Sequence, residues 1–165
     1  MLDPIDRPVI FLDVDGVLNH DEWTAARRAR QEPWPRDADL IDPACVARVQ
    51  RICNAAGAVV VISSWWREVV GMPRTTTALR AQGLTAEIVG ATPIIPAPFG
   101  SFERRSMRGD EIRSWLDAHA MTDRWVVLDD THVDVAPDRF VRTSVDIGLT
   151  DADVERAVAI LRGCA

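Results

Sequence analysis

The stretch PVIFLDVDG (residues 8–16) decides how this chain is expected to fold. Residues 8–12 form a continuous apolar run, which is typical of a strand that is covered on both faces in a parallel sheet. Two aspartates, Asp13 and Asp15, and then Gly16 follow the run directly. In open α/β sheets ligands bind just beyond the carboxyl ends of the strands, so this stretch predicts both a buried strand and the start of a site.

Four further segments have the composition of short strands and lie between turn signals. They are AVVVIS (58–63), AEIVG (86–90), WVVLDD (125–130) and RFVRT (139–143). Helical patterns alternate with them, over 42–56, 109–119 and from 150 onward, each with an apolar stripe at three-to-four-residue spacing. This order predicts an α/β fold with a doubly wound, Rossmann-like parallel sheet, formed by a single domain over residues 1–165.

The composition excludes several classes of protein. The 165 residues are 47% hydrophobic and 27% charged, which is ordinary for a packed globular domain. All 19 basic residues are arginine and 25 residues are acidic, so the net charge of −6 argues against a protein that coats nucleic acid without sequence preference. No signal peptide and no membrane-length apolar run is recognised, and we expect a cytoplasmic protein with Cys45 and Cys53 as buried thiols.

The polar residues at the three apolar strand ends are four carboxylates and two hydroxyls: Asp13, Asp15, Ser63, Ser64, Asp129 and Asp130. Parallel strands present their carboxyl ends at one edge of the sheet, so these side chains are expected to converge. Several carboxylates gathered in one place are costly without a cation. Mg²⁺, a hard ion that prefers oxygen ligands, is the cofactor that this pattern predicts.

Three of these segments also resemble the motifs of a known family. FLDVDGVLN (11–19) is similar to the first motif, DxDGxLx, of the haloacid-dehalogenase (HAD) superfamily of phosphohydrolases, and VVVIS (59–63) and VVLDD (126–130) resemble its second and fourth motifs. SSWWR (63–67), RGDEIRSWL (108–116) and the segment 141–150 resemble the HAD domain of nucleic-acid (RNA) repair proteins and polynucleotide 3′-phosphatases.

The resemblance implies a role for each strand-end residue. Asp13 would be the nucleophile that forms an aspartyl-phosphate, and Asp15 would be the general acid and base. Ser63 would donate a hydrogen bond to the phosphoryl oxygens. Mg²⁺ would be bound directly by Asp13, by the backbone carbonyl of Asp15 and by Asp130. Asp129 would lie next to these ligands without contacting the ion.

The third motif of the family usually supplies a lysine, which this chain lacks. Arg108 stands in the matching place, and its permanent charge suits a phosphate, but Arg104 and Arg105 are close competitors. The residues assigned to substrate binding surround these motifs: Gly16, Asn19, Ser64, Trp66, Arg67, Arg104 and Arg105. One of the two tryptophans at 65 and 66 is expected in the core, and His20 is expected at the surface.

The spacing of the motifs leaves room for no cap or only a minimal one. The Pro-, Arg- and Trp-rich stretches 20–41 and 91–107 are expected to be surface loops, with room for a short helix in the first. An open site suits a large substrate, and the expected rim carries arginines at 27, 28, 30, 104 and 105 and tryptophans at 23, 34, 65 and 66. We therefore expect a phosphomonoesterase, foremost a polynucleotide 3′-phosphatase that acts on DNA or RNA ends. The alternatives are a phosphatase of small metabolites or nucleotides, a protein phosphatase, and a catalytically idle binding domain.

Overall fold

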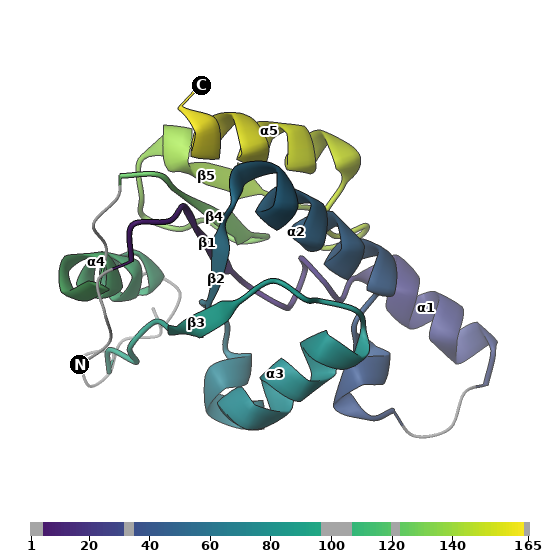
Figure 1. The fold of residues 1–165 in the computed structure, drawn as a ribbon. Coiled ribbons are helices and arrows are strands. Elements are labelled where there is room, and N and C mark those ends of the chain that lie inside the picture. Colours follow the sequence, from purple (N-terminus) through teal and green to yellow (C-terminus); the bar gives the residue numbers. More distant parts are fainter. Residues whose placement is uncertain (1–4, 32–34, 97–106, 120–122, 164–165) are drawn as a thin grey trace.

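A computed structural model of the chain describes residues 5–31, 35–96, 107–119 and 123–163. Its centre is a five-stranded parallel sheet in the order β3-β2-β1-β4-β5 (Figure 1). The strands are β1 (Val9–Leu12), β2 (Val59–Ile62), β3 (Ile88–Ala91), β4 (Trp125–Asp129) and β5 (Phe140–Arg142). Each lies within a residue or two of a predicted strand, so the predicted doubly wound α/β fold is confirmed.

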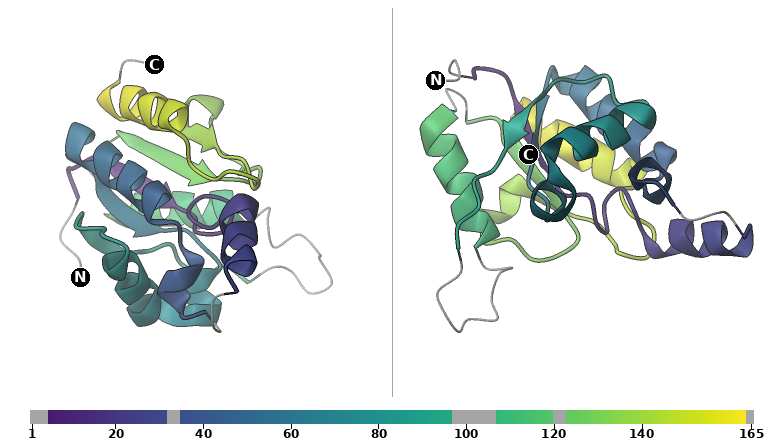
Figure 2. Two further views of the ribbon diagram at one scale, coloured as in Figure 1. Left: turned by 90° about the vertical axis from the view of Figure 1, so that its right-hand side faces the viewer. Right: turned by 90° about the horizontal axis from the view of Figure 1, so that it is seen from below.

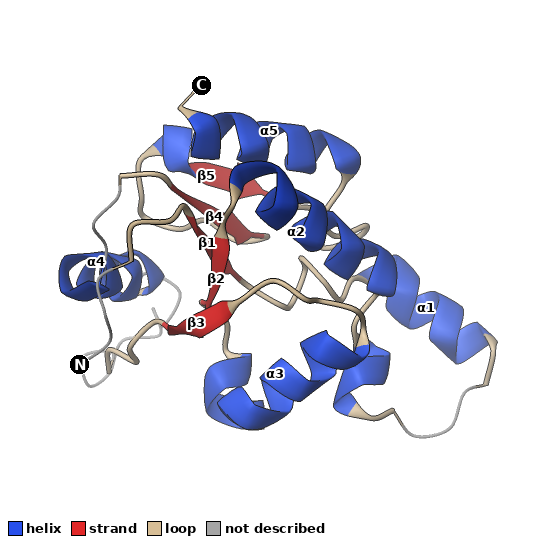
Figure 3. Ribbon diagram, viewed as in Figure 1, coloured by secondary structure: helices blue, strands red, loops and turns tan. Residues whose placement is uncertain are grey.

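The helices are α1 (Asp21–Ala29), α2 (Pro43–Ala56), α3 (Met72–Ala81), α4 (Arg108–His119) and α5 (Asp151–Arg162). Helices cover both faces of the sheet, α4 on one side and α2, α3 and α5 on the other (Figure 3). Buried residues of α2, α3 and α5 pack with Ile10, Leu12 and their neighbours in one apolar cluster. Phe11 and Val61 face the other way and pack with Ile112 and Trp115 of α4 in a second cluster. The alternation of these strand residues between the two clusters follows from the two-residue period of a strand.

The caps of the helices agree with the sequence. Asp42 accepts a hydrogen bond from the Ala44 amide at the start of α2, and Gly57 ends that helix in a left-handed conformation with φ of 66°. Thr150 and Asp153 form the predicted capping box of α5. Cys45 and Cys53 are buried thiols, as predicted. None of the helices in the described ranges is long and apolar enough to cross a membrane.

Residues 20–41 are predicted to form a surface loop or a short helix, and the structure shows the short helix. This stretch contains α1 and a 3-10 helix (Asp37–Leu40), although α1 has no buried residue and projects from the body of the molecule (Figure 2). His20 caps α1, and its Nε2 lies 3.0 Å from Asp42 Oδ2. With only 9% of its surface exposed, His20 is not the surface residue that we expected.

Candidate active site

The register of the sheet places three predicted site residues side by side. Leu12 of β1 is paired with Ile62 of β2 and with Leu128 of β4. The next residue of each strand is therefore in one row at the carboxyl edge: Asp13, Ser63 and Asp129. Their strand parity is that of Phe11, Val61 and Val127, which face α4, so the row lies under the start of that helix.

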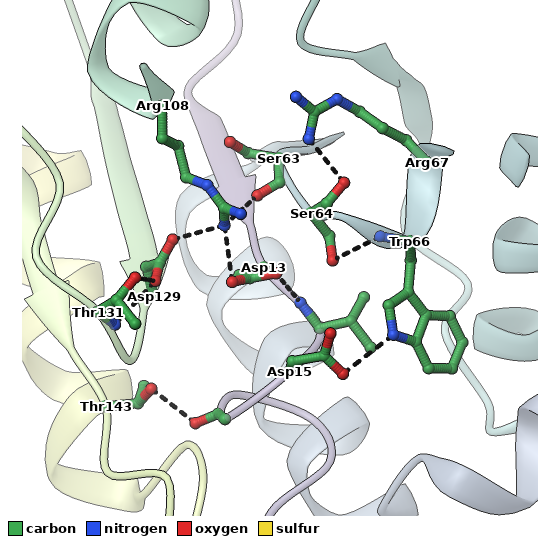
Figure 4. A network of polar contacts seen from close by, with 12 residues as sticks. Asp13, Asp15, Ser63, Ser64, Trp66, Arg67, Arg108, Asp129, Thr131 and Thr143 are labelled. Carbon is green, nitrogen blue, oxygen red and sulfur yellow. Dashed lines mark hydrogen bonds and ion pairs between the residues drawn. The ribbon is translucent and has the colours of Figure 1, made fainter. Parts of the chain in front are cut away.

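Arg108, the first residue of α4, joins the members of this row (Figure 4). Its Nη1 lies 2.7 Å from Asp13 Oδ2 and 2.7 Å from Asp129 Oδ2, and it donates to the backbone carbonyl of Ser63 at 2.7 Å. One nitrogen thus makes all three contacts. The Arg108 side chain is 17% exposed and also lines the pocket described below.

The two carboxylates beside Arg108 are electrostatically strained. Burial raises the pKa of Asp13 to about 6, and the negative charge of Asp129 adds to this rise, while Arg108 opposes it. Burial also raises the pKa of Asp129, again against the opposing effect of Arg108. Asp129 is further held by the Thr131 amide at 2.9 Å and the Thr131 hydroxyl at 2.8 Å. Both carboxylates therefore gain from additional positive charge nearby.

Asp15 lies beyond the strand end, where its carboxylate is exposed to the pocket. Its Oδ1 accepts two hydrogen bonds, from Asn19 Nδ2 at 2.6 Å and from the indole Nε1 of Trp66 at 3.0 Å. Asn19 also accepts from the Gly16 amide through its Oδ1 at 3.2 Å. The Asn19 side chain, which we predicted to bind substrate, thus uses both ends of its amide inside the 15–19 loop.

Gly16 occupies a place that no other residue fits without movement. Its φ is +71°, and a Cβ built on it would lie 2.4 Å from Cγ and 2.5 Å from Cβ of Asp130. The Gly16 carbonyl accepts a hydrogen bond from the Thr143 hydroxyl at 2.8 Å, which ties the loop to the end of β5. The first-motif loop and the fourth-motif loop therefore meet in close contact at Gly16 and Asp130.

The hydroxyls after β2 behave differently from one another. Ser64 Oγ accepts the amide of Trp66 at 3.2 Å and acts as a local cap. Ser63 Oγ is buried and has no hydrogen-bond partner among the described residues. A buried hydroxyl without a partner is costly, and a ligand oxygen in the row would satisfy it.

We predicted that Trp66 and Arg67 bind substrate, but the structure places neither side chain on the pocket side of the site. Trp66 is 4% exposed and belongs to the core beneath α2 and α3. The Arg67 side chain is 5% exposed, with Nη2 at 2.6 Å from Glu111 Oε2 and Nη1 donating to the Ser64 carbonyl at 2.6 Å. This buried pair braces the turn after β2 against α4 and was not predicted; Glu111 lies one helical turn after Arg108.

A pocket of about 530 Å³ opens above the row. Its wall includes the half-exposed Trp65, together with Val145, which was not predicted. Of the predicted residues the wall contains Asp13, Asp15, Gly16, Asn19, Arg108 and Asp130. Arg104 and Arg105 lie outside the described residues, so the competition for the third-motif role is not resolved by their positions.

The donor set at the base of the pocket fits a hard divalent cation. One carboxylate oxygen from each of Asp13, Asp129 and Asp130 lies within 4.8 Å of the others. Carboxylate oxygens in such a cluster are the ligands that Mg²⁺ prefers. Burial, and to a smaller extent the charge of Asp129, raises the pKa of Asp13, and a cation nearby would favour its charged form.

Comparison with known proteins gives one match. A family profile described as "HAD domain in Swiss Army Knife RNA repair proteins" matches residues 9–154, which includes the first strand, the row and the start of α5. No curated protein and no solved structure shows significant similarity to the chain.

Proposed function

Because the chain belongs to the HAD domains of Swiss Army Knife RNA repair proteins, we propose that it is a magnesium-dependent phosphomonoesterase of nucleic-acid ends, with polynucleotide 3′-phosphatase as its reaction. A HAD-type phosphatase is what the family suggests in general terms. The 3′-phosphate, the magnesium and the roles of individual residues are our proposal.

The observation that carries the proposal is the row at the carboxyl edge. Asp13 lies at the base of an open pocket, with its Oδ2 at 2.7 Å from Arg108 Nη1. The neighbouring residue in the row is Ser63, whose buried hydroxyl has no hydrogen-bond partner in the part of the chain that the structure describes. A phosphoryl group in this place would meet a nucleophile, a hydrogen-bond donor and a cation at once. Positive charge close to Asp13 is needed, since a carboxylate and a phosphate dianion repel each other.

Two steps follow from these positions. In the first, the Asp13 carboxylate attacks phosphorus, the bond from phosphorus to the leaving oxygen breaks, and Asp15 donates a proton to that oxygen. In the second, water attacks the aspartyl-phosphate, Asp15 accepts the proton, and the bond between Asp13 and phosphorus breaks to release phosphate. Ser63 and Arg108 stabilise the phosphoryl oxygens in both steps.

Asp13, Asp130 and the backbone carbonyl of Asp15 would hold Mg²⁺, with Asp129 next to them as the partner of Arg108 and Thr131. When bound, the cation would neutralise charge that builds up on the phosphoryl group. The close approach of Gly16 to Asp130 supports this assignment, because it keeps the first- and fourth-motif carboxylates together.

A nucleic-acid end is the substrate class that the surroundings favour. All strands in the described ranges belong to the one sheet, and the described residues between β1 and β2 form only α1, a 3-10 helix and α2, which is too little for a separate cap domain. The exposed rim carries Trp65, an aromatic side chain of the kind on which bases stack. α1 begins at the pocket wall and carries Arg28 on its exposed surface. Base stacking contributes about 1–3 kcal/mol for each base, and arginine contacts to phosphate add a salt-dependent attraction.

The test is a comparison of phosphate release from four kinds of substrate in the presence of Mg²⁺. They are a 3′-phosphorylated oligonucleotide, its 5′-phosphorylated isomer, a mononucleotide 3′-phosphate and a set of sugar phosphates, each also assayed with Asp13→Asn. We expect kcat/KM for the 3′-phosphorylated oligonucleotide to exceed that of the mononucleotide by about tenfold or more at low salt, and the advantage to shrink as salt rises. Equal rates would favour a small-molecule phosphatase, and no turnover of any ester would favour a binding domain.

A further inference from the structure

We infer that Trp66 is a positioning residue for Asp15, and that its indole N–H orients the carboxylate which the proposed function uses as acid and base. The inference rests on the proposed function for the meaning of that orientation. The contact itself is a hydrogen bond of 3.0 Å from Trp66 Nε1 to Asp15 Oδ1, between residues 51 positions apart in the chain (Figure 4).

The indole is fixed on a rigid support. Trp66 is 4% exposed and packs in the main apolar cluster, so its ring has no room to turn away. Its amide is bonded to Ser64 Oγ at 3.2 Å, and the next residue, Arg67, holds the Ser64 carbonyl at 2.6 Å. The turn that follows β2 therefore carries the phosphoryl-binding hydroxyl of Ser63 and the donor to Asp15 in one stiff segment.

The two donors to Asp15 select which of its oxygens faces the reaction. Asn19 and Trp66 both donate to Oδ1, so the proton that Asp15 gives or takes in the proposed reaction belongs on Oδ2. A carboxylate on an exposed loop otherwise samples several rotamers, and fixing one oxygen restricts it to those that present the other. General acid–base catalysis depends on this geometry, because the acid must lie within hydrogen-bond reach of the leaving oxygen.

A simpler explanation is that Trp66 only fills the core. Trp115 provides the comparison, since it is 2% exposed and packs edge-on against Phe11 in the second apolar cluster, but it lines no part of the pocket. Replacing either tryptophan by phenylalanine removes the indole N–H and a similar volume. Only Trp66→Phe removes a donor to the proposed acid.

The contact is tested first without any activity, in the protein free of metal. The chain has six tryptophans, so its ¹H–¹⁵N spectrum contains six indole signals, which can be assigned through the backbone. Asp15→Ala should move the Trp66 indole signal upfield by more than any of the other five, because it loses a bond to a charged acceptor. An unmoved Trp66 signal overturns the inference, whatever the protein catalyses.

The orientation is tested by single-turnover rates on two esters. Trp66→Phe should slow cleavage of an alkyl phosphate, whose leaving oxygen needs a proton, by about tenfold or more, while release of nitrophenol from nitrophenyl phosphate should change no more than in Trp115→Phe. Asp15→Asn should show the same selectivity with a larger loss. If the wild type cleaves both esters and Trp66→Phe matches Trp115→Phe on each, the positioning role is wrong and the proposed function stands. If the wild type cleaves neither ester, the proposed function and the acid role of Asp15 fall together, even where the indole contact is observed.

Discussion

Ionisation of Asp13 should destabilise the folded protein, and the effect can be measured as a dependence of stability on pH. Burial and the Asp129 charge raise the pKa of Asp13 from 3.8 to about 6. The folded state thus binds this proton more tightly than the unfolded state, so the contribution to stability is present below pH 3.8 and is lost as the pH rises through 6. The whole difference corresponds to about 3 kcal/mol, of which about 2 kcal/mol falls between pH 4.5 and pH 7.5.

Asp13→Asn removes this titration, so the free energy of unfolding of the variant minus that of the wild type should rise by about 2 kcal/mol from pH 4.5 to pH 7.5. Any constant cost of placing an amide beside Arg108 cancels in that comparison. For a chain of 165 residues the change corresponds to about 4–8 °C in Tm.

The assay is urea or thermal denaturation in EDTA at several pH values, with Asp138→Asn as the control for loss of one exposed carboxylate. Mg²⁺ added at pH 7.5 should then raise the Tm of the wild type more than that of Asp13→Asn. A difference between variant and wild type that does not change with pH would refute the electrostatic reasoning.

Substitutions of Gly16, Arg108 and Glu111 test the contacts in and around the row. Gly16→Ala should lower activity by about tenfold or more and lower the free energy of unfolding in urea by about 2 kcal/mol. The reason is that its Cβ would lie 2.4 Å from Asp130 Cγ and that the φ of this residue is +71°. Wild-type activity together with wild-type stability would contradict the close packing. Arg108→Lys should keep kcat within about tenfold of the wild type, because one lysine ammonium can make the contacts that Nη1 now makes. Arg108→Ala should lower kcat by about 10²–10³. Equal losses in the two variants would mean that more than one nitrogen of the guanidinium is required. Glu111→Gln should lower the free energy of unfolding by about 3–5 kcal/mol, because it leaves the buried charge of Arg67 unpaired. Asp110→Asn, which removes a carboxylate from an exposed ion pair, should lower it far less in the same denaturation assay.

The sheet was predictable because a strand that is buried on both faces consists of consecutive apolar residues. The residues of β1 and β2, and those of β4 up to Leu128, form unbroken apolar runs, and each run is followed directly by a polar residue of the row. α1 could be predicted only as an alternative to a loop, because an apolar stripe arises from burial and this helix has no buried residue. Its N-terminus is also capped by His20, which is not among the residues that usually mark a helix start.

The meeting of the polar residues at the carboxyl ends of β1, β2 and β4 was predictable from the sequence. Within a strand the two-residue period fixes which side chains share a face, and the parallel register then places Asp13, Ser63 and Asp129 in one row. Beyond Ser64 the chain turns into a wide helical turn (Arg67–Gly71), and the period changes. The conformation of the chain at this turn decides whether Trp65 or Trp66 faces the pocket. The local sequence contains no pattern from which that conformation can be predicted. The Arg67–Glu111 pair could not be predicted either, because its two residues lie 44 positions apart in separate elements.

The destabilising charge of the row is placed directly against the best-packed part of the sheet. Leu12, Ile62 and Leu128, the residues immediately before the row, are each fully buried. Burial of such a side chain stabilises a fold by about 1.5–3 kcal/mol, so these three neighbours alone outweigh the cost of about 3 kcal/mol that Asp13 imposes when ionised. Because this support lies one residue behind the reacting groups, the strand ends remain ordered while the carboxylates stay short of positive charge. A cation bound among these carboxylates would supply the positive charge that their burial makes favourable.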